Sequence, residues 1–321
     1  MQPKSHDTKH KTTIGGQALI EGVMMRGPKK SAMAVRTPDG TIVREDVKFN
    51  SLTKKVKFLK WPFFRGIIMF GESLVLGYRT LMRSATLAGE EEITEPGKTE
   101  QWIAKKTKIN VLSIMLFLSA LIGIGLSVAL FMFLPAFTSS LIERHLWPAM
   151  GETGWAKTLV EGLIRITIFV CYLGLVSMMK DIRRVFEYHG AEHQTIYCYE
   201  EGMDLTVENV KKFSSYHPRC GTSFLFIVMI VSIFVFMLIP PGVHMLVRIG
   251  YQLCLLPFVA GTTYEINRAV GRHCNWFTRM ISAPGMALQR FTTRTPDDAQ
   301  IEVAIAALEE VLDFDSGEDK W

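Results

Sequence analysis

The chain has 321 residues, of which 48% are hydrophobic and 11% aromatic, and its 20 Phe and 17 Met far outnumber its 8 Tyr. Mean hydropathy is positive at +0.19 although 21% of the residues are charged, so charged and apolar residues must be segregated along the chain. This composition excludes disordered, collagen-like and disulfide-stapled proteins. It predicts a membrane protein with sizeable water-exposed parts.

The charge balance and the cysteines point the same way. The 36 Lys and Arg exceed the 31 Asp and Glu, a net charge of +5 that fits a protein facing the cytoplasmic side of a membrane. Aromatic residues follow the apolar runs, so we expect no nucleic-acid partner. The five Cys form an odd set without a C-x-x-C pair, which argues against a disulfide framework. No apolar stretch follows the first basic residues, so we expect no cleavable signal peptide.

Strands are expected first along the chain, after a disordered tail at residues 1–12. SAMAVR and TIVREDV alternate in polarity and flank a Pro-Asp-Gly turn signal at 38–40, which predicts a β-hairpin within residues 14–49. The glycine-rich block IGGQALIEGVMMRGP at 14–28 could form an anion-binding loop or a strand and turn. It has neither G-x-G-x-x-G nor a Walker lysine, which favours the strand and turn.

A charged stripe characterises the apolar segment 61–82. Arg65, Glu72 and Arg79 lie seven residues apart and therefore on one face of a helix, which predicts an interfacial or protein-packed helix rather than a lipid-exposed span. A glutamate-rich linker follows at 90–97. We expect residues 13–107 to form a cytoplasmic, β-containing part with this helix.

Four segments of residues 108–281 are candidates for membrane spans, which need about 20 apolar helical residues. They are 109–142, 158–179, the uncharged stretch between Arg219 and Arg248, and 249–264. The second carries Glu161 and Arg165 near its start, so it spans only if both reach the interface. The fourth is short and contains Pro257, so it is either a kinked span or a re-entrant segment.

Basic residues cluster before the first segment, after the second, before the third and after the fourth. The two other connections, 143–157 and 241–248, carry only three Lys or Arg. We therefore expect a multi-pass protein of the inner cell membrane. The positive-inside rule places both of its termini and the loop 180–219 in the cytoplasm.

The loop 180–219 contains the sequence H-x-x-E-H from His189 to His193. On a helix the two histidines lie one turn apart on one face, so both imidazoles can bind one metal ion. Glu192 lies beside them, where it can act as general base toward a water molecule. This spacing is that of the inverted zincins.

A catalytic metal site needs a third ligand, and several candidates are expected at the same membrane face. His217 and Cys220 precede the third segment, and Glu265 and His273 follow the fourth. A mixed set of His, Glu and Cys ligands favours zinc or a similar divalent ion. Two alternatives stay open: Cys220 could be a thiol nucleophile with His217 as its base, or these groups could be ordinary polar residues at an interface.

The C-terminal part, residues 282–321, is expected to hold a cytoplasmic amphipathic helix and a tail. Thr-Pro-Asp-Asp at 295–298 is a helix start signal. Apolar residues then repeat on one face, which must pack on another element; they are Ile301, Ile305, Leu308 and Leu312.

Several blocks together resemble one family. They are IGGQALIEGVMMRGP, EYHGAEHQTIYCYE, SSYHPRCGTSF and PGMALQRFTTRTPDDAQIEVAIAAL, and the likeness runs from about residue 12 to residue 312. They resemble the YqhQ-like bacterial family, the domain of unknown function 1385. The resemblance implies a multi-pass membrane protein of a group thought to be metal-dependent enzymes, with no reaction assigned. The matching motif positions are His189, Glu192, His193, His217 and Cys220.

These inferences predict an α-helical integral membrane protein with about four transmembrane helices and a small β-containing cytoplasmic N-terminal part. The leading functional hypothesis is a zinc-dependent hydrolase that acts on a lipid-linked or membrane-proximal peptide substrate. Glu192 is its expected base, and the candidate metal ligands are His189, His193, His217, Cys220 and Glu265. The rival is a non-enzymatic membrane scaffold with a structural His and Cys metal site. A transporter ranks last, because only Glu161 and Arg165 carry charge inside a span.

Overall fold

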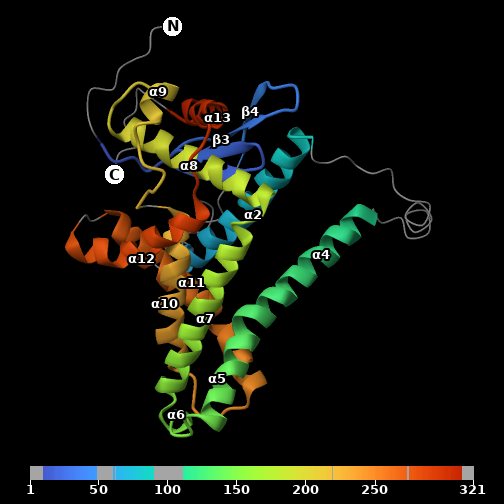
Figure 1. Cartoon of the computed structure of the whole chain (residues 1–321), viewed down its shortest axis with the longest axis vertical. Coiled ribbons are helices and arrows are strands. Elements are labelled where there is room, and N and C mark those ends of the chain that lie inside the picture. Colours follow the sequence, from blue (N-terminus) through green and yellow to red (C-terminus); the bar gives the residue numbers. More distant parts are fainter. Residues whose placement is uncertain are drawn as a thin grey trace. The chain divides into compact units, whose positions relative to one another are not determined.

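The computed structural model describes residues 10–48, 61, 63–89, 111–218, 220–272 and 275–312 (Figure 1). Most of the expected N-terminal tail, the linker at 90–97 and the C-terminal tail from 313 lie outside these residues, as does His273. The strands are β1 (Gly15–Leu19), β2 (Gly22–Arg26), β3 (Ser31–Arg36) and β4 (Ile42–Asp46). The helices are α2 (Phe64–Leu87), α4 (Val111–Val128), the π-helical turn η2 (Ala129–Phe133), α5 (Leu134–His145), α6 (Met150–Thr153), α7 (Trp155–Val176), α8 (Lys180–Glu200), α9 (Val207–Val210), α10 (Gly221–Phe236), α11 (Met245–Arg272), α12 (Trp276–Thr292) and α13 (Asp298–Glu309).

The four strands form one antiparallel sheet in the order β1-β2-β3-β4. The predicted hairpin is confirmed as β3 and β4, and Gly40 supplies the positive φ of 86° in the turn between them. The glycine-rich block forms β1 and β2, as the strand-and-turn interpretation predicts. Glu21 lies in the short turn between these strands with a φ of 50°, a conformation unusual for a residue other than glycine.

The sheet is covered on both faces. Because side chains alternate along a strand, Val23, Met25 and their neighbours in β3 pack against α8 and α13. Met24 and Met33 point the opposite way and pack with Leu76 of α2. Burial on both faces explains why the central strands read as nearly continuous apolar sequence. Figure 1 shows α8 and α13 beside the sheet.

The predicted C-terminal amphipathic helix is confirmed as α13. Asp297 is its N-cap, and its carboxylate and the side chain of Gln300 form a reciprocal capping box. Ile301, Ile305 and Leu308 are buried, so the apolar face packs on the sheet and α8 as expected.

The helix expected at 61–82 is α2, which extends to Leu87. It packs on the sheet through Leu76, and its close approach at Gly77 leaves room for Gln17 of β1. Arg65 donates to Glu265 of α11, with Nε to Oε1 at 2.7 Å, so part of the charged stripe binds protein rather than solvent. Of the two predicted alternatives, an interfacial or a protein-packed helix, these contacts favour the protein-packed one.

Three helical stretches of the described chain are long and apolar enough to cross a membrane, where the sequence predicts four. They are Leu121–His145, Trp155–Val176 and Met245–Val270. The third predicted span is α10, whose 16 helical residues fall short of the length that a hydrocarbon core requires. The segment with Pro257 is one continuous helix rather than a re-entrant segment, because α11 runs from Met245 to Arg272.

The contacts divide the chain into two units. The first comprises residues 1–90, 172–231 and 257–321, and the second comprises residues 91–171 and 232–256. Within the second unit, Glu161 accepts hydrogen bonds from Arg165 Nη2 at 3.0 Å and from Arg248 Nε at 2.8 Å. Glu161 is 1% exposed, so the predicted pair of Glu161 and Arg165 exists but is buried rather than reaching solvent.

Candidate metal centre

The helix α8 carries the H-x-x-E-H motif, as the spacing predicts. Gly190 inside the motif has a packing reason, because a Cβ there would collide with the carbonyl oxygen of Arg294. The main chain of Arg294 also donates a hydrogen bond to the Phe186 carbonyl at 2.9 Å. Gly190 lowers the intrinsic helix propensity of α8, but its missing side chain lets the segment at Arg294, which follows α12, pack directly on α8.

Three of the predicted ligands converge in the first unit. One potential ligand atom from each of His189, His193 and Cys220 lies within 4.8 Å of the other two. His189 Nε2 is 3.1 Å from Cys220 Sγ, and the two imidazole rings have centroids 4.4 Å apart. The two histidines come from neighbouring turns of α8, and Cys220 is the residue directly before α10. Two imidazoles and one thiol are donors that suit zinc or a similar transition metal.

Main-chain carbonyls orient both imidazoles. His189 Nδ1 lies 2.8 Å from the Thr292 carbonyl, and His193 Nδ1 lies 2.6 Å from the Ser215 carbonyl. A carbonyl oxygen can only accept a hydrogen bond, so each Nδ1 must carry the proton. In a neutral imidazole with this tautomer, Nε2 keeps its lone pair for a ligand, which is the outer-shell arrangement common to metal-binding histidines.

Cys220 is a buried thiol at the start of α10. The main-chain N–H and the hydroxyl of Thr222 donate to its Sγ at 3.4 and 3.2 Å. Hydrogen bonds of this kind orient a metal-binding side chain from its outer shell. The imidazole that lies 3.1 Å from Cys220 Sγ is that of His189, whereas the nucleophile interpretation of Cys220 names His217 as its base.

Glu192 lies on a neighbouring face of α8, about 100° from His193 around the helix axis. Its carboxyl group is buried, and burial raises the pKa of Glu192, while His189 and a hydrogen bond from the Gly16 N–H act against that rise. Its carboxylate is not among the three clustered ligand atoms. The structure thus places Glu192 between the histidines and the first strand, on the side of α8 that faces the sheet.

His217 and Glu265, the remaining predicted ligands, have other partners. His217 Nε2 lies 3.7 Å from the carboxylate of Glu200, and its ring centroid is 5.6 Å from that of His193. Gln289 of α12 clamps the His217 main chain, accepting from its N–H and donating to its carbonyl at 2.8 and 2.7 Å. Glu265 is bound to Arg65. His217 therefore borders the cluster, and Glu265 belongs to an ion pair.

An ion pair fixes α8 against the β1–β2 turn. Glu21 accepts from Arg184 Nη2 at 2.6 Å and from the hydroxyl of Tyr188 at 3.1 Å. Arg184, Tyr188 and Glu192 follow one another at intervals of four residues and so share the α8 face that contacts the first hairpin. This clamp sets the position of β1 beside Glu192.

Sequence reasoning missed several groups that build the centre. Thr292 and Ser215 bind the imidazoles through their main-chain carbonyls. Every residue has such a carbonyl, so the sequence does not show which ones take part. Gln289 acts through its amide, but nothing in the sequence pairs it with His217. The resemblance block around PGMALQRFTT covers Gln289 and Thr292, and it is the one signal that pointed to this segment.

Comparison with known proteins decides the family. The sequence profile described as "Protein of unknown function (DUF1385)" matches residues 61–314. The uncharacterized protein YqhQ of Bacillus subtilis (strain 168) is 33% identical over 312 residues, which cover 95% of this chain and 94% of that protein. The chain belongs to the DUF1385 family. No solved structure matches it. The description of the family assigns no reaction, so the functional argument rests on the geometry of the centre.

Proposed function

We propose that this DUF1385 protein is an integral membrane protein whose His189, His193 and Cys220 bind a divalent metal ion, zinc being the best fit, and that it is a metal-dependent hydrolase. The observation that carries the proposal is the convergence of the three ligand atoms within 4.8 Å. The two Nδ1–H groups bound to carbonyls support it, because they leave both Nε2 atoms for the ion. Three protein ligands with a fourth position for water or substrate are typical of catalytic rather than structural zinc.

The chemistry follows from the position of each residue. A bound zinc ion would supply Lewis acidity toward a carbonyl or phosphoryl oxygen. Glu192 would accept the proton of the attacking water and later return it to the leaving group. The Gly16 N–H would orient its carboxylate, and burial would keep competing water away. His217, held by Gln289 and bordered by Glu200, would position the His193 side of the cluster.

The substrate class follows from the surroundings of Cys220. The proposed ligand directly precedes the apolar helix α10, and three other helical stretches are apolar enough to span a membrane. A scissile bond at this centre would lie close to a membrane surface. We therefore propose a lipid-linked or membrane-proximal peptide substrate, approached from the cytoplasmic side that the positive-inside rule assigns to the segment 180–219.

Metal analysis of the purified full-length protein tests the centre. Wild type should retain close to one equivalent of metal, whereas H189A, H193A and C220S should each lose most of it. H244A and C254S are matched controls, because His244 and Cys254 are exposed and lie outside the cluster. After replacement by Co²⁺, wild type should show a cobalt–thiolate absorption band that C220S lacks. Unchanged metal content in H189A and H193A would overturn the metal centre.

A substitution of Glu192 distinguishes the enzyme from the rival function, a scaffold with a structural metal site. E192Q keeps the size of the side chain and removes the base. The enzyme proposal expects E192Q to retain its metal and to lose the phenotype that the intact gene rescues in a deletion strain. A scaffold expects E192Q to behave as wild type in both measurements. Loss of metal in E192Q as complete as in H193A would make Glu192 a ligand and refute the proposed mechanism.

The orientation has its own test in reporter fusions. Fusions at residues 95, 200 and 300 should report a cytoplasmic location, and fusions near 150 and 242 an external one. The pair at 200 and 242 decides whether the 16-residue helix α10 crosses the membrane with its flanks. Identical results at these two points would mean that it does not, and the four-span topology would be wrong.

A further inference from the structure

A buried cluster of charged side chains joins α7 and α11 within the second unit. Glu161 accepts hydrogen bonds from Arg165 of its own helix and from Arg248 of α11. The three residues are 1%, 8% and 3% exposed, and both helices are apolar enough to cross a membrane. Ionisable residues in such segments are rare and usually mark a functional site. Nothing in the proposed hydrolase mechanism uses this cluster.

The cluster carries one more positive charge than negative charges. Among the described residues, Glu161 is the one acid whose charge acts on Arg165, and Arg248 adds a second positive charge. Lys157 and Glu143 in the same unit balance each other as an ion pair. An uncompensated charge in a low-dielectric interior is costly, because no opposite charge offsets its loss of hydration. The cluster therefore lacks one negative charge.

Protein groups contact all three nitrogens of the Arg165 guanidinium. Nε donates to the Phe131 carbonyl at 2.7 Å. Nη2 donates to the carboxylate of Glu161 at 3.0 Å and lies 3.4 Å from Oε1 of Gln252. Nη1 lies 3.5 Å from the hydroxyl oxygen of Ser232. These contacts hold Arg165 in place, so a ligand for the uncompensated charge is expected at the other arginine.

Arg248 has one nitrogen without a partner among the described residues. Its Nε donates to Glu161 Oε2 at 2.8 Å, and its Nη2 donates to the hydroxyl of Thr158 at 2.7 Å. Its Nη1 makes no hydrogen bond to any residue that the structure describes. Buried donors in folded proteins nearly always have a partner. Nη1 is not fully enclosed, so a small solute can touch it although the side chain is only 4% exposed.

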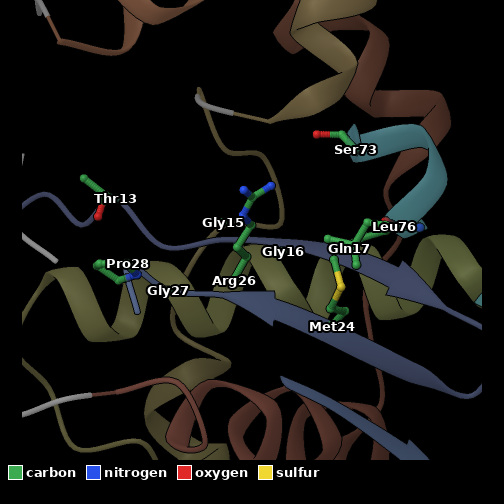
Figure 2. A pocket seen from close by; sticks show the side chains of 10 residues that line it. All are labelled: Thr13, Gly15, Gly16, Gln17, Met24, Arg26, Gly27, Pro28, Ser73 and Leu76. Atoms are coloured by element: carbon green, nitrogen blue, oxygen red, sulfur yellow. The ribbon is translucent and has the colours of Figure 1, made fainter. Parts of the chain in front are cut away.

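The polar groups of the pocket beside β1 and β2 differ in this respect (Figure 2). The hydroxyl of Ser73 donates to the Met69 carbonyl, and the N–H of Gly27 donates to the Lys30 carbonyl, both at 2.8 Å. Arg26, the charged residue of its lining, also has a partner. The cluster on α7 and α11 thus combines two features that this pocket lacks, an uncompensated charge and an unpartnered buried donor.

The position of the cluster limits the size of its ligand. Arg248 lies in the first turn of α11, which begins at Met245, so the positive end of the helix dipole adds to its charge. Glu161 lies six residues after Trp155, the first residue of α7, or about 9 Å along the helix. Trp155 is 56% exposed, which suits the aromatic belt at a membrane interface. Only a small ion reaches a donor that is this enclosed at this depth.

We propose that Arg248 Nη1 binds one small monovalent anion, chloride in the cell, which balances the positive charge of the cluster. One negative charge brings the net charge to zero, whereas a divalent anion would reverse it. A guanidinium is weakly hydrated, so it pairs best with anions that release their own water readily, which favours chloride and bromide over fluoride. The proposal is independent of the metal centre, because no residue of this cluster belongs to the His and Cys group.

Thermal unfolding of the purified full-length protein in a non-ionic detergent tests the site. At constant ionic strength, replacing sodium gluconate by sodium chloride should raise the unfolding midpoint in a saturable manner, since a ligand of the folded state stabilises it. Bromide should act like chloride, and fluoride and sulfate should not. Absence of a saturable shift with chloride and bromide would overturn the proposal. A saturable shift with dihexanoyl phosphatidic acid but not with chloride would also overturn it, and would assign the cluster to a phosphate head group.

Three variants locate the ion. R248Q removes the uncompensated charge and the unpartnered donor, so the chloride shift should disappear. K157Q removes a cation from the start of the same helix α7 and should keep the wild-type shift. E161Q leaves two positive charges without a carboxylate, so its apparent affinity for chloride should tighten about tenfold. An equal chloride shift in R248Q and wild type would refute Arg248 as the site, and weaker chloride binding by E161Q would refute charge balance as its basis.

A direct binding measurement does not depend on the folding of any variant. Equilibrium dialysis of the wild-type protein with radiolabelled chloride should show about one bound ion per chain, the number that balances the cluster. Unlabelled bromide should displace this ion and gluconate should not. Absence of saturable chloride binding, or displacement by gluconate as effective as that by bromide, would overturn the proposal.

Discussion

Gly16 and Glu192 are in direct contact although they lie far apart in the sequence. A Cβ added to Gly16 would be 2.7 Å from Cδ and 2.8 Å from Oε1 of Glu192, closer than real Cβ atoms come to their neighbours. The Gly16 N–H donates a hydrogen bond to the same carboxylate. The strand β1 thus packs directly against the carboxylate of Glu192 and holds this proposed base beside the two histidines. Only glycine fits at position 16, because any Cβ there would collide with Glu192.

Replacement of Gly16 by Ala should therefore displace the Glu192 carboxylate. The close contact has to be relieved inside a packed region, so we expect a loss of about 1–3 kcal/mol in the free energy of unfolding. Metal content should stay at the wild-type level because no ligand is touched, while rescue of the deletion phenotype should fail. Denaturant unfolding, metal analysis and complementation measure these three effects.

The neighbouring glycine is the control for this experiment. A Cβ at Gly15 meets nothing within 4 Å, so G15A should change the free energy of unfolding by about 0.5 kcal/mol or less and should leave complementation intact. If G16A and G15A behave alike, the contact between Gly16 and Glu192 has no role in positioning the base.

The buried charges of the second unit predict a larger effect on stability. Glu161 accepts from Arg165, from Arg248 and from Gln252, and its side chain is 2% exposed. E161Q would leave two guanidinium groups in a low-dielectric environment without their counter-charge. We expect a loss of about 3–5 kcal/mol, measured by denaturant titration in detergent.

A nearby ion pair provides the comparison. Glu143 accepts from Lys157 at 2.6 Å, but the two side chains are 29% and 19% exposed. E143Q should cost about 1 kcal/mol or less, because partly solvated pairs contribute little. Equal losses for E161Q and E143Q would show that the Glu161 network is solvated and not buried as described.

Ion pairs between the sheet and the end of α13 predict a dependence of stability on acid pH. Lys30 and then Arg44 hold the pKa of Glu310 below its ordinary value, with distances of 3.0 and 3.4 Å. A folded-state pKa below the unfolded value means that the stabilisation is present above about pH 4.3 and is lost as the pH falls toward the lower, folded-state value. Arg83 lowers the pKa of Glu45 in the same direction.

The unfolding midpoint should accordingly decrease as the pH is lowered from about 5, and the difference between wild type and E310Q should shrink over the same interval. At neutral pH that difference should be about 1 kcal/mol or less, because the pair lies at the surface. E208Q, at an exposed position of α9, is the control and should follow wild type at every pH. A constant difference between wild type and E310Q down to acid pH would contradict the assignment.

The parts of the fold that the sequence predicts are those that local residues specify. The start of α13 needs only the Thr-Pro-Asp-Asp sequence at 295–298, and the β3–β4 turn needs only Pro38, Asp39 and Gly40. The same holds for the pairing of His189 and His193, which one turn of helix brings together whatever surrounds it. These predictions were confirmed because their physical causes lie within a few residues.

The predictions that differ from the structure depend on distant packing. The uncharged stretch between Arg219 and Arg248 predicts a longer helix than the 16-residue α10, because such a stretch does not show where a helix ends and a turn begins. Glu265 was a candidate ligand on the basis of its membrane face, yet Arg65 of α2 competes for it. The contacts of Gly16 with Glu192 and of Thr292 with His189 join segments whose relative positions only the folded chain defines.

The last prediction concerns Thr222, whose N–H and hydroxyl both donate to Cys220 Sγ. T222V keeps the shape of the side chain and removes the hydroxyl donor. Outer-shell groups of this kind change metal affinity by about 10- to 100-fold, so T222V should bind zinc at least tenfold more weakly than wild type in a competition with a chelator of known affinity. T222S keeps the hydroxyl and should restore wild-type affinity, which separates the hydrogen bond from the packing of the methyl group. Wild-type zinc affinity in T222V would show that the hydroxyl does not support a thiolate at Cys220, and a loss in T222S equal to that in T222V would assign the effect to packing alone.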